Sequence, residues 1–461
     1  MSYKAKIVTI SKINPIPNKD RIVAAEIEEI PGLQVVVGKD VKPGDVMVYF
    51  PENTQLSEEF CIANDLYEKD LGNGKRSGYF DHKRRVKIIK LGGVRSEGFL
   101  VPISHFDYLR DTEGYKEIFG YCPGYESIIA KPSYEFDAIG SHQICKKYRI
   151  RFLHTPAKPK TKWEKIKQWF AGKKLAKNYY DAYDEFERHP DTEQFRDWIK
   201  RIPFGALLII TEKIHGQSAR TGKLRELSWW KRLIERLLGE IFNGYQLMIG
   251  TRETVLNARG FHKAEFRKQL AQKFANCAEG EDFSYEIAGY DDSGNSLMKR
   301  QGLGKLKKEY DLAGFSDPMD YKYGCKPKEC REFVYKLDIV TNGVRNVQSW
   351  DHTVNRCAEL GLQTVPELDR FVHIDVGETL DRVNEWLAND KMKASTIDSS
   401  HLIEGVCVRV EELDNMGFVK QEWRVFKHKS FLFGVLEGYA RENNEVEAEE
   451  LESLENDKEE Q

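Results

Sequence analysis

The first hundred positions alternate short apolar segments with turn signals. The segments are rich in Val and Ile, and a Lys-Pro-Gly-Asp turn at 42–45 separates two of them. No long amphipathic helix interrupts this stretch, which argues against a βαβ nucleotide-binding domain. Several short strands between Gly and Pro turns predict a small β-barrel. The expected strands are residues 4–10, 23–27, 33–37, 46–50 and 83–91, the last of which ends at Gly92-Gly93.

The pattern becomes α+β from about residue 186. Residues 207–210 form an apolar segment typical of a buried strand, and 285–288, 333–340 and 405–410 predict further strands. Apolar residues recur at helical spacing between Trp229 and Phe242, which predicts a packed helix.

Composition restricts the class of protein. The 461 residues are 40% hydrophobic and 31% charged, and a chain of this length holds about two to four domains. The longest apolar run, residues 204–210, is far shorter than the roughly 20 residues of a membrane span. Eight scattered cysteines complete no zinc spacing and indicate reduced thiols. We expect a cytoplasmic monomer that does not contact membranes.

Charge is unevenly distributed along the chain. Residues 440–461 hold ten acidic and two basic residues, so they carry −8, and the other 439 residues carry −3 + 8 = +5. The tail predicts a solvated, disordered end, or an acidic mimic that competes for a basic surface. Residues 158–177 hold eight lysines with Trp163, Trp169 and Phe170 interleaved. This segment predicts either an RNA-binding strip or an amphipathic linker helix.

Candidate chemistry begins at Glu212-Lys213-Ile214-His215-Gly216, which follows the apolar strand 207–210. A lysine becomes a nucleophile only when its amine loses a proton, which desolvation or neighbouring cations favour. An ordinary surface lysine beside a turn is the alternative.

Further charged residues lie on the later strands. Lys427 and Lys429 share one face of a predicted strand, because side chains alternate with period two. Two neighbouring ammonium groups favour a phosphate between them, although lysines also protect exposed strand edges. Arg252 suits a bidentate grip on phosphate, and Glu286 and Glu404 are carboxylates on or beside strands.

The order of these elements resembles the covalent nucleotidyltransferase superfamily of RNA ligases, DNA ligases and capping enzymes. DNA ligases and capping enzymes usually carry Asp two residues after the lysine, where this chain has His215. That difference resembles RNA ligases that seal nicks in duplexes. The matching elements, in order, are Lys213, Arg252, Glu286, the strand 333–339, Glu404, Lys427 and Lys429.

The N-terminal region is similar to one group within this superfamily, the Deinococcus-type RNA ligases, through residues 14–23, 36–39, 48–52 and 95–102. The resemblance covers roughly residues 1–150 and 186–437. It implies an OB-type β-barrel followed by an ATP-grasp-like antiparallel nucleotidyltransferase domain. The expected parts are an OB module with extension at 1–155, a Lys-rich linker at 156–185, the ligase domain at 186–437 and the acidic tail at 438–461.

The resemblance also implies a reaction and its residues. Lys213 would form a lysyl–AMP with ATP, AMP would pass to an RNA 5′-phosphate, and a 3′-hydroxyl would displace it, sealing RNA ends or a nick in an RNA-containing duplex. Glu404, with Glu286, would hold Mg²⁺ or Mn²⁺. The residues expected at the nucleotide are Glu212, His215, Gly216, Arg252, Glu286 and Tyr335, with Lys427 and Lys429 at the α-phosphate.

Some assignments stay open. His215 either orients the nucleotide or Lys213, or is a packed structural residue. Tyr335 or the aliphatic Leu337 covers the adenine, and we favour Tyr335. In the barrel, Lys83, Arg84, Arg85 and Lys87 supply positive charge for nucleic-acid phosphates. The alternatives are a DNA ligase or capping-type nucleotidyltransferase, or a non-catalytic protein that binds nucleic acid.

Overall fold

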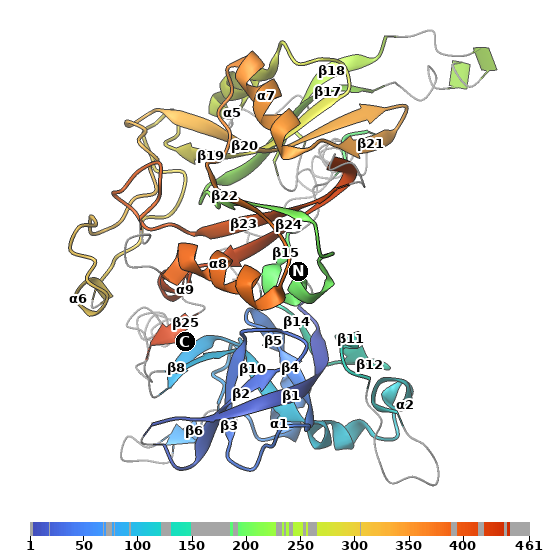
Figure 1. Cartoon of the computed structure of the whole chain (residues 1–461), viewed down its shortest axis with the longest axis vertical. Coiled ribbons are helices and arrows are strands. Elements are labelled where there is room, and N and C mark those ends of the chain that lie inside the picture. Colours follow the sequence, from blue (N-terminus) through green and yellow to red (C-terminus); the bar gives the residue numbers. More distant parts are fainter. Residues whose placement is uncertain are drawn as a thin grey trace, which may run out of the picture. The chain divides into compact units, whose positions relative to one another are not determined.

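The structure is a computed structural model that describes most of the chain (Figure 1). The described residues are 3–17, 19–67, 69–70, 76–77, 79–91, 94–120, 131–148, 185–187, 192–226, 233–234, 237–238, 243–251, 255–256, 265–304, 306–388, 394–413, 419–437 and 440–442. They belong to two compact units. Unit 1 spans Met1–Arg151, Arg196–Lys200 and Phe431–Gln461, and unit 2 spans Phe152–Phe195 and Arg201–Ser430.

Unit 1 is built on an antiparallel sheet in which β1 to β4 are strands that the apolar pattern predicts, whereas β10 and β11 were not predicted. Its strand order is β10-β4-β1-β2-β3, and β11 also pairs with β1. The β3 strand lies beside β9, where the Val36 amide donates to Ser96 Oγ over 2.9 Å. The strands are β1 (Ala5–Pro15), β2 (Ile22–Ile27), β3 (Gln34–Gly38), β4 (Val46–Phe50), β9 (Val94–Glu97), β10 (Phe99–Pro102) and β11 (Glu135–Phe136).

Smaller elements complete unit 1. The predicted strand 83–91 is shorter than expected, as only β8 (Ile88–Leu91) is extended, in a hairpin with β9. The described start of the acidic tail, β25 (Ala440–Glu442), pairs with β8. The other elements are β5 (Thr54–Leu56), β6 (Lys69–Asp70), β7 (Arg76–Ser77), β12 (Ala138–Ile139), β13 (His142–Gln143), β14 (Cys145–Lys147), α1 (Glu58–Ala63), α2 (Tyr115–Phe119), α9 (Phe431–Leu436) and η1 (Ile103–Leu109).

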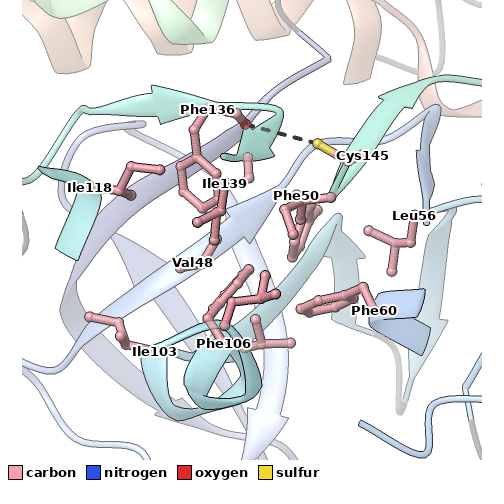
Figure 2. Packing of buried hydrophobic residues seen from close by; sticks show 14 of the residues in the cluster. Val48, Phe50, Leu56, Phe60, Ile103, Phe106, Ile118, Phe136, Ile139 and Cys145 are labelled. Atoms are coloured by element: carbon pink, nitrogen blue, oxygen red, sulfur yellow. Dashed lines mark hydrogen bonds between the residues drawn. The ribbon is translucent and has the colours of Figure 1, made fainter. Parts of the chain in front are cut away.

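Both faces of the unit 1 sheet are buried. Because side chains alternate along a strand, Ile7 and Val48 lie in one apolar core and Val8 and Met47 in another. The first core packs the sheet against α1, α2 and η1, and Figure 2 shows its phenylalanines together with Cys145. The sheet is therefore covered on both faces, while its assignment as an OB-type barrel stays a prediction.

Unit 2 contains two five-stranded sheets. In the first sheet the order is β15-β24-β23-β16-β22, and α8 packs against β23; in the second it is β18-β17-β19-β20-β21, with α5 and α7 against β20 (Figure 1). The first sheet comprises β15 (Glu193–Gln194), β16 (Leu207–Glu212), β22 (Glu367–Val372), β23 (Gly405–Leu413) and β24 (Val419–Lys429). The second comprises β17 (Gln217–Arg225), β18 (Tyr245–Thr251), β19 (Glu281–Gly289), β20 (Cys330–Thr341) and β21 (Val344–Val347).

The helices of unit 2 follow from caps and amphipathic patterns. Ser349 caps α7 by accepting the His352 amide, and Gly361 ends it in a left-handed conformation. The helices are α5 (Glu265–Ala271), α6 (Leu306–Glu309), α7 (Trp350–Leu360) and α8 (Val376–Ala388), with the short 3₁₀ turn η6 (Gln272–Phe274). Two further 3₁₀ turns, η4 (Phe195–Asp197) and η5 (Ile199–Arg201), lie where the chain passes from one unit to the other.

Three expectations have clear outcomes. The mixed α+β class is confirmed, and all seven described cysteines are free thiols. Between Trp229 and Phe242 the described residues 233–234 and 237–238 are helical as expected, but the expected packing is wrong for the leucines, because Leu233, Leu237 and Leu238 are 53%, 77% and 71% exposed. Over the described ranges, no helix is long and apolar enough to cross a membrane. The Lys-rich segment 158–177 and tail residues 443–461 lie outside the described residues.

Candidate functional site

The turn between β16 and β17 carries Lys213. Its amide donates to the Gly405 carbonyl over 2.9 Å, which fixes the turn to the start of β23. Gly216 ends the turn, and a Cβ at this position would lie 2.6 Å from the Ile287 carbonyl oxygen. A glycine is needed there because the turn passes directly over the backbone of β19.

Glu404 lies at the centre of the site. The residue is only 2% exposed, and its carboxylate faces three basic side chains. Oε1 lies 2.8 Å from Lys213 Nζ and 2.9 Å from Lys429 Nζ, and Oε2 lies 3.3 Å from His215 Nδ1. The structure thus brings together Lys213, His215, Glu404 and Lys429, four of the expected site residues, and their roles in a reaction stay predictions.

These contacts set the protonation states. Burial by itself would raise the pKa of Glu404, but Lys213, Lys429 and His215 outweigh it and hold that pKa well below its usual value. Burial would lower the pKa of Lys213, and Lys429 also lowers it, yet the attraction of Glu404 leaves it raised. Before substrate binds, Lys213 is thus a protonated, ion-paired ammonium group.

The expected lysine pair lies on one face of β24. Lys427 pairs with Cys407 and Lys429 with Gly405, so both side chains project from the same face as Lys213. His428, between them, points the other way and its Nε2 lies 2.9 Å from Asn384 Oδ1 of α8. The strand therefore presents two cations to the site.

The opposite sheet supplies Glu286 and Tyr335. Glu286 contributes to the raised pKa of both Lys213 and Tyr335, which places its carboxylate near both groups. Tyr335 is half-buried, and its hydroxyl lies 3.5 Å from Ser218 Oγ. The two residues thus line the face of this sheet that is turned away from α5 and α7.

Tyr335 and Leu337 do not share a face, although regular alternation along a strand would place residues two apart on one face. The register shifts between Ser284 and Tyr285, so Tyr335 is an extra, bulged residue of β20. Leu337 is fully buried in the core beneath α5 and α7. A bulge cannot be recognised from one strand, because it depends on the pairing partner.

Glu212 is turned away from Glu404. Its carboxylate accepts hydrogen bonds from the hydroxyls of Ser395 and Thr396, the first over 2.6 Å, and from the Thr396 amide over 2.9 Å. The buried carboxylate therefore anchors the loop before β23.

Residues without a predicted role surround the site. Tyr321 and Tyr323, from the connection between β19 and β20, contact His215, and His401 packs on both tyrosines. Arg409 of β23 donates to the Tyr335 carbonyl and stacks on Trp350. The alternation of 405–410 could have placed Arg409 on the Lys213 side, but no sequence pattern indicated the tyrosines.

The remaining predicted residues lie elsewhere. Arg252 lies outside the described residues. In unit 1, Arg85 donates to Asn53 Oδ1 and stacks on Tyr148, while Arg84 donates to Leu56 O and Tyr67 OH. Lys87 is only 7% exposed. Much of this basic segment is therefore engaged within unit 1, and its role at nucleic acid stays a prediction.

The donor set is compatible with a nucleotide-bound metal ion. Within the part of the chain that the structure describes, no three His, Cys, Asp or Glu side chains are grouped to hold a metal ion by themselves. Mg²⁺ at nucleotide sites commonly uses one or two carboxylates together with phosphates and water. Glu404 and Glu286 both act on Lys213, so these two carboxylates fit such an ion.

Comparisons with known proteins identify the fold. No protein-family model and no curated protein sequence matches the chain. Among solved structures, Naegleria gruberi RNA ligase with PPi is similar at 15% identity and a TM-score of 0.52, covering 93% of this chain and 97% of that one. A lysine-to-alanine variant of that ligase with ATP and Mn aligns at 14% identity and a TM-score of 0.53, over 95% and 99%. At these identities the likeness shows that the chain has the fold of an RNA ligase.

Proposed function

We propose that this protein is an ATP-dependent RNA ligase that joins 3′-hydroxyl and 5′-phosphate ends, at nicks in RNA-containing duplexes. The observation that carries the proposal is the group of Lys213, Glu404 and Lys429, in which one buried carboxylate oxygen lies between a lysine on a fixed turn and a second lysine. The similarity of the fold to an RNA ligase whose structures were solved with PPi, with ATP and Mn, or with AMP and Mn supports it.

In the first step, the neutral Lys213 amine attacks the α-phosphorus of ATP. A phosphorus–nitrogen bond forms, the bond to the bridging oxygen breaks, and pyrophosphate leaves with the bonding electron pair. The amine loses its proton, and Lys427 and Lys429 neutralise charge that develops on the α-phosphate. Fixed cations aimed at developing charge are a major source of catalysis in such transfers.

The second and third steps join RNA. A 5′-phosphate oxygen attacks the phosphorus of lysyl–AMP, which forms a phosphoanhydride and returns the lysine amine. A 3′-hydroxyl then attacks the activated 5′-phosphate, loses its proton and displaces AMP. No lysine nucleophile takes part in this last step, so it tests the fold of the site independently of Lys213.

Glu286 and Tyr335 line the opposite wall, where Glu286 is suited to the ribose hydroxyls and Tyr335 to the adenine ring. Glu404, with Glu286, would hold Mg²⁺ or Mn²⁺. When bound, this cation supplies positive charge that competes with Lys213 for Glu404 and so favours the neutral amine. The residues of unit 1 from Lys83 to Lys87 would contact RNA phosphates.

Nick sealing is the experiment that tests this function. The protein is incubated with ATP, Mg²⁺ and a duplex with one nick flanked by a 3′-hydroxyl and a labelled 5′-phosphate. We expect a joined strand when the 3′ end is RNA, with ATP preferred over GTP. Covalent labelling by GTP without joining would indicate a capping-type transferase. Binding of the duplex without any covalent chemistry would indicate a binding protein.

A further inference from the structure

The turn that carries Lys213 is held at two backbone amides. The Lys213 amide is bound by the Gly405 carbonyl of β23, and the His215 amide donates to the Tyr323 hydroxyl over 2.7 Å. Ile214, between them, is 2% exposed. The side chain of Lys213 therefore projects from a turn whose two ends are fixed by different elements.

Tyr323 belongs to the connection between β19 and β20 and is fully buried. Its ring lies against Phe333 and edge-on to His401, with centroids 5.8 and 4.3 Å apart. Tyr321, two residues earlier, packs edge-on against the imidazole of His215 at 4.5 Å. Two side chains of one short segment thus contact the same residue of the Lys213 turn, one at its backbone and one at its ring.

The backbone at Tyr323 is unfavourable for its residue type. Its φ is +47°, in the left-handed region, which bulky side chains rarely adopt. Asp398 holds this conformation from outside the turn, because its Oδ2 accepts the Gly324 amide over 2.8 Å. Within the turn, the Cys325 amide donates to the Lys322 carbonyl over 2.9 Å. Backbone strain that the surroundings maintain is concentrated at functional sites.

We propose that Tyr323 is a positioning residue for the formation of lysyl–AMP. By accepting the His215 amide, its hydroxyl fixes the turn so that Lys213 Nζ is in line with the α-phosphorus, and Tyr321 fixes the orientation of the imidazole. Tyr323 does not touch the reacting atoms. This inference rests on the proposed function. It gives a role to the segment that carries Tyr321 and Tyr323, to which the sequence motifs assign none.

The test is Tyr323→Phe in the full chain, which removes only the hydroxyl and leaves the buried His215 amide without its acceptor. Small displacements of a reacting group have large effects on rate, about 100-fold for 1 Å. We expect the rate of lysyl–AMP formation at saturating ATP to fall about 10- to 100-fold, while KM for ATP stays close to that of the parent.

Tyr285→Phe is the matched control. Tyr285 is also fully buried, and its hydroxyl lies 2.8 Å from Thr221 Oγ1, but its ring packs in the core beneath α5. This variant should form lysyl–AMP at the parental rate. Sealing of a chemically pre-adenylated nick by each preparation reports the folded fraction, because that step needs no lysine nucleophile.

The outcomes are distinct. Selective loss of lysyl–AMP formation by Tyr323→Phe, with sealing of the pre-adenylated nick retained, supports the inference. Equal loss of both reactions, or a parental rate of lysyl–AMP formation, overturns it and leaves the proposed function standing. A parent protein that takes no AMP from ATP overturns the proposed function and this inference together.

Discussion

Glu404 concentrates the electrostatics of the site in one buried carboxylate. Its two oxygens face Lys213, Lys429 and His215, and the pKa of the carboxyl is held well below its usual value by these groups in spite of burial. A group whose pKa is lower in the folded state stabilises that state above its unfolded pKa, which is about 4.3 for glutamate. This contribution is lost as the pH falls through the folded-state value.

Glu404→Gln should therefore be less stable than the parent at neutral pH by about 1–3 kcal/mol, the usual loss when a charged hydrogen-bond partner is removed. The difference should shrink as the pH falls below about 4.3. Urea unfolding of both proteins across an acidic pH series measures it.

Glu52 of unit 1 is a control whose pKa is shifted in the opposite direction to that of Glu404. Burial, with Asp197 and Glu97 nearby, raises the pKa of Glu52 to about 7. Its ionisation therefore disfavours the folded state as the pH rises from about 4.3 toward 7. Glu52→Gln should gain stability over the parent in that window. A difference for Glu404→Gln that does not change with pH would contradict the assignment of Glu404 as the ion-paired group.

Residue types and spacing predicted part of the site. The family resemblance assigned Lys213, His215, Glu404 and Lys429 to one nucleotide site, and the structure brings these four side chains together. The direction of the Glu212 carboxylate could not be predicted, because it depends on Ser395 and Thr396, far along the chain. Tyr323 was missed for the same reason, since its contact with His215 joins residues 108 positions apart.

At the scale of elements, the side chains of β24 alternate between two faces of the sheet, and the two faces have different roles. Lys427 and Lys429 face the site, and His428 faces α8. Lys427→Ala and Lys429→Ala should each slow lysyl–AMP formation by about 100- to 1000-fold, by analogy with the loss of one donor to a developing oxyanion. Rapid-quench measurement of labelled protein at saturating ATP gives the rates.

His428→Gln is the control on the same strand. Its side chain packs toward α8, so the variant should lose stability and keep its rate of lysyl–AMP formation. If the two lysine variants react like the parent, these lysines only protect a strand edge.

Strands were more predictable than other elements. Apolar segments at 207–210 and 405–410 were found because their side chains are buried on β16 and β23, although β16 continues to Glu212. The apolar spacing around Leu233 and Leu237 predicted burial, but both side chains are exposed. A periodic apolar face shows that a helix is amphipathic and does not show what covers it.

At the scale of the whole molecule, the chain passes between the two units near positions 151, 195, 200 and 430. The described residues expected at the nucleotide lie between Glu212 and Lys429, within unit 2. A truncated chain of residues 185–430 should therefore still form lysyl–AMP. It should fail to seal a nick, because unit 1 is proposed to hold the nucleic acid.

Both reactions are measured on the same truncated preparation, with the full chain as reference. Retention of labelling with loss of sealing supports the division between the units. Equal loss of both reactions would mean that unit 1 only supports the fold of unit 2. Full retention of sealing would remove unit 1 from substrate binding.

Locating the residue that carries AMP is the most direct test of the proposed chemistry. The protein is incubated with ATP and Mg²⁺, digested, and the AMP-bearing peptide is sequenced by mass spectrometry under alkaline conditions that preserve a phosphoramide. We expect AMP on Lys213, no adduct on Lys213→Ala, and sealing of a pre-adenylated nick by that variant. AMP on another residue, or undiminished ATP-dependent sealing by Lys213→Ala, would contradict the role of Lys213 as the nucleophile.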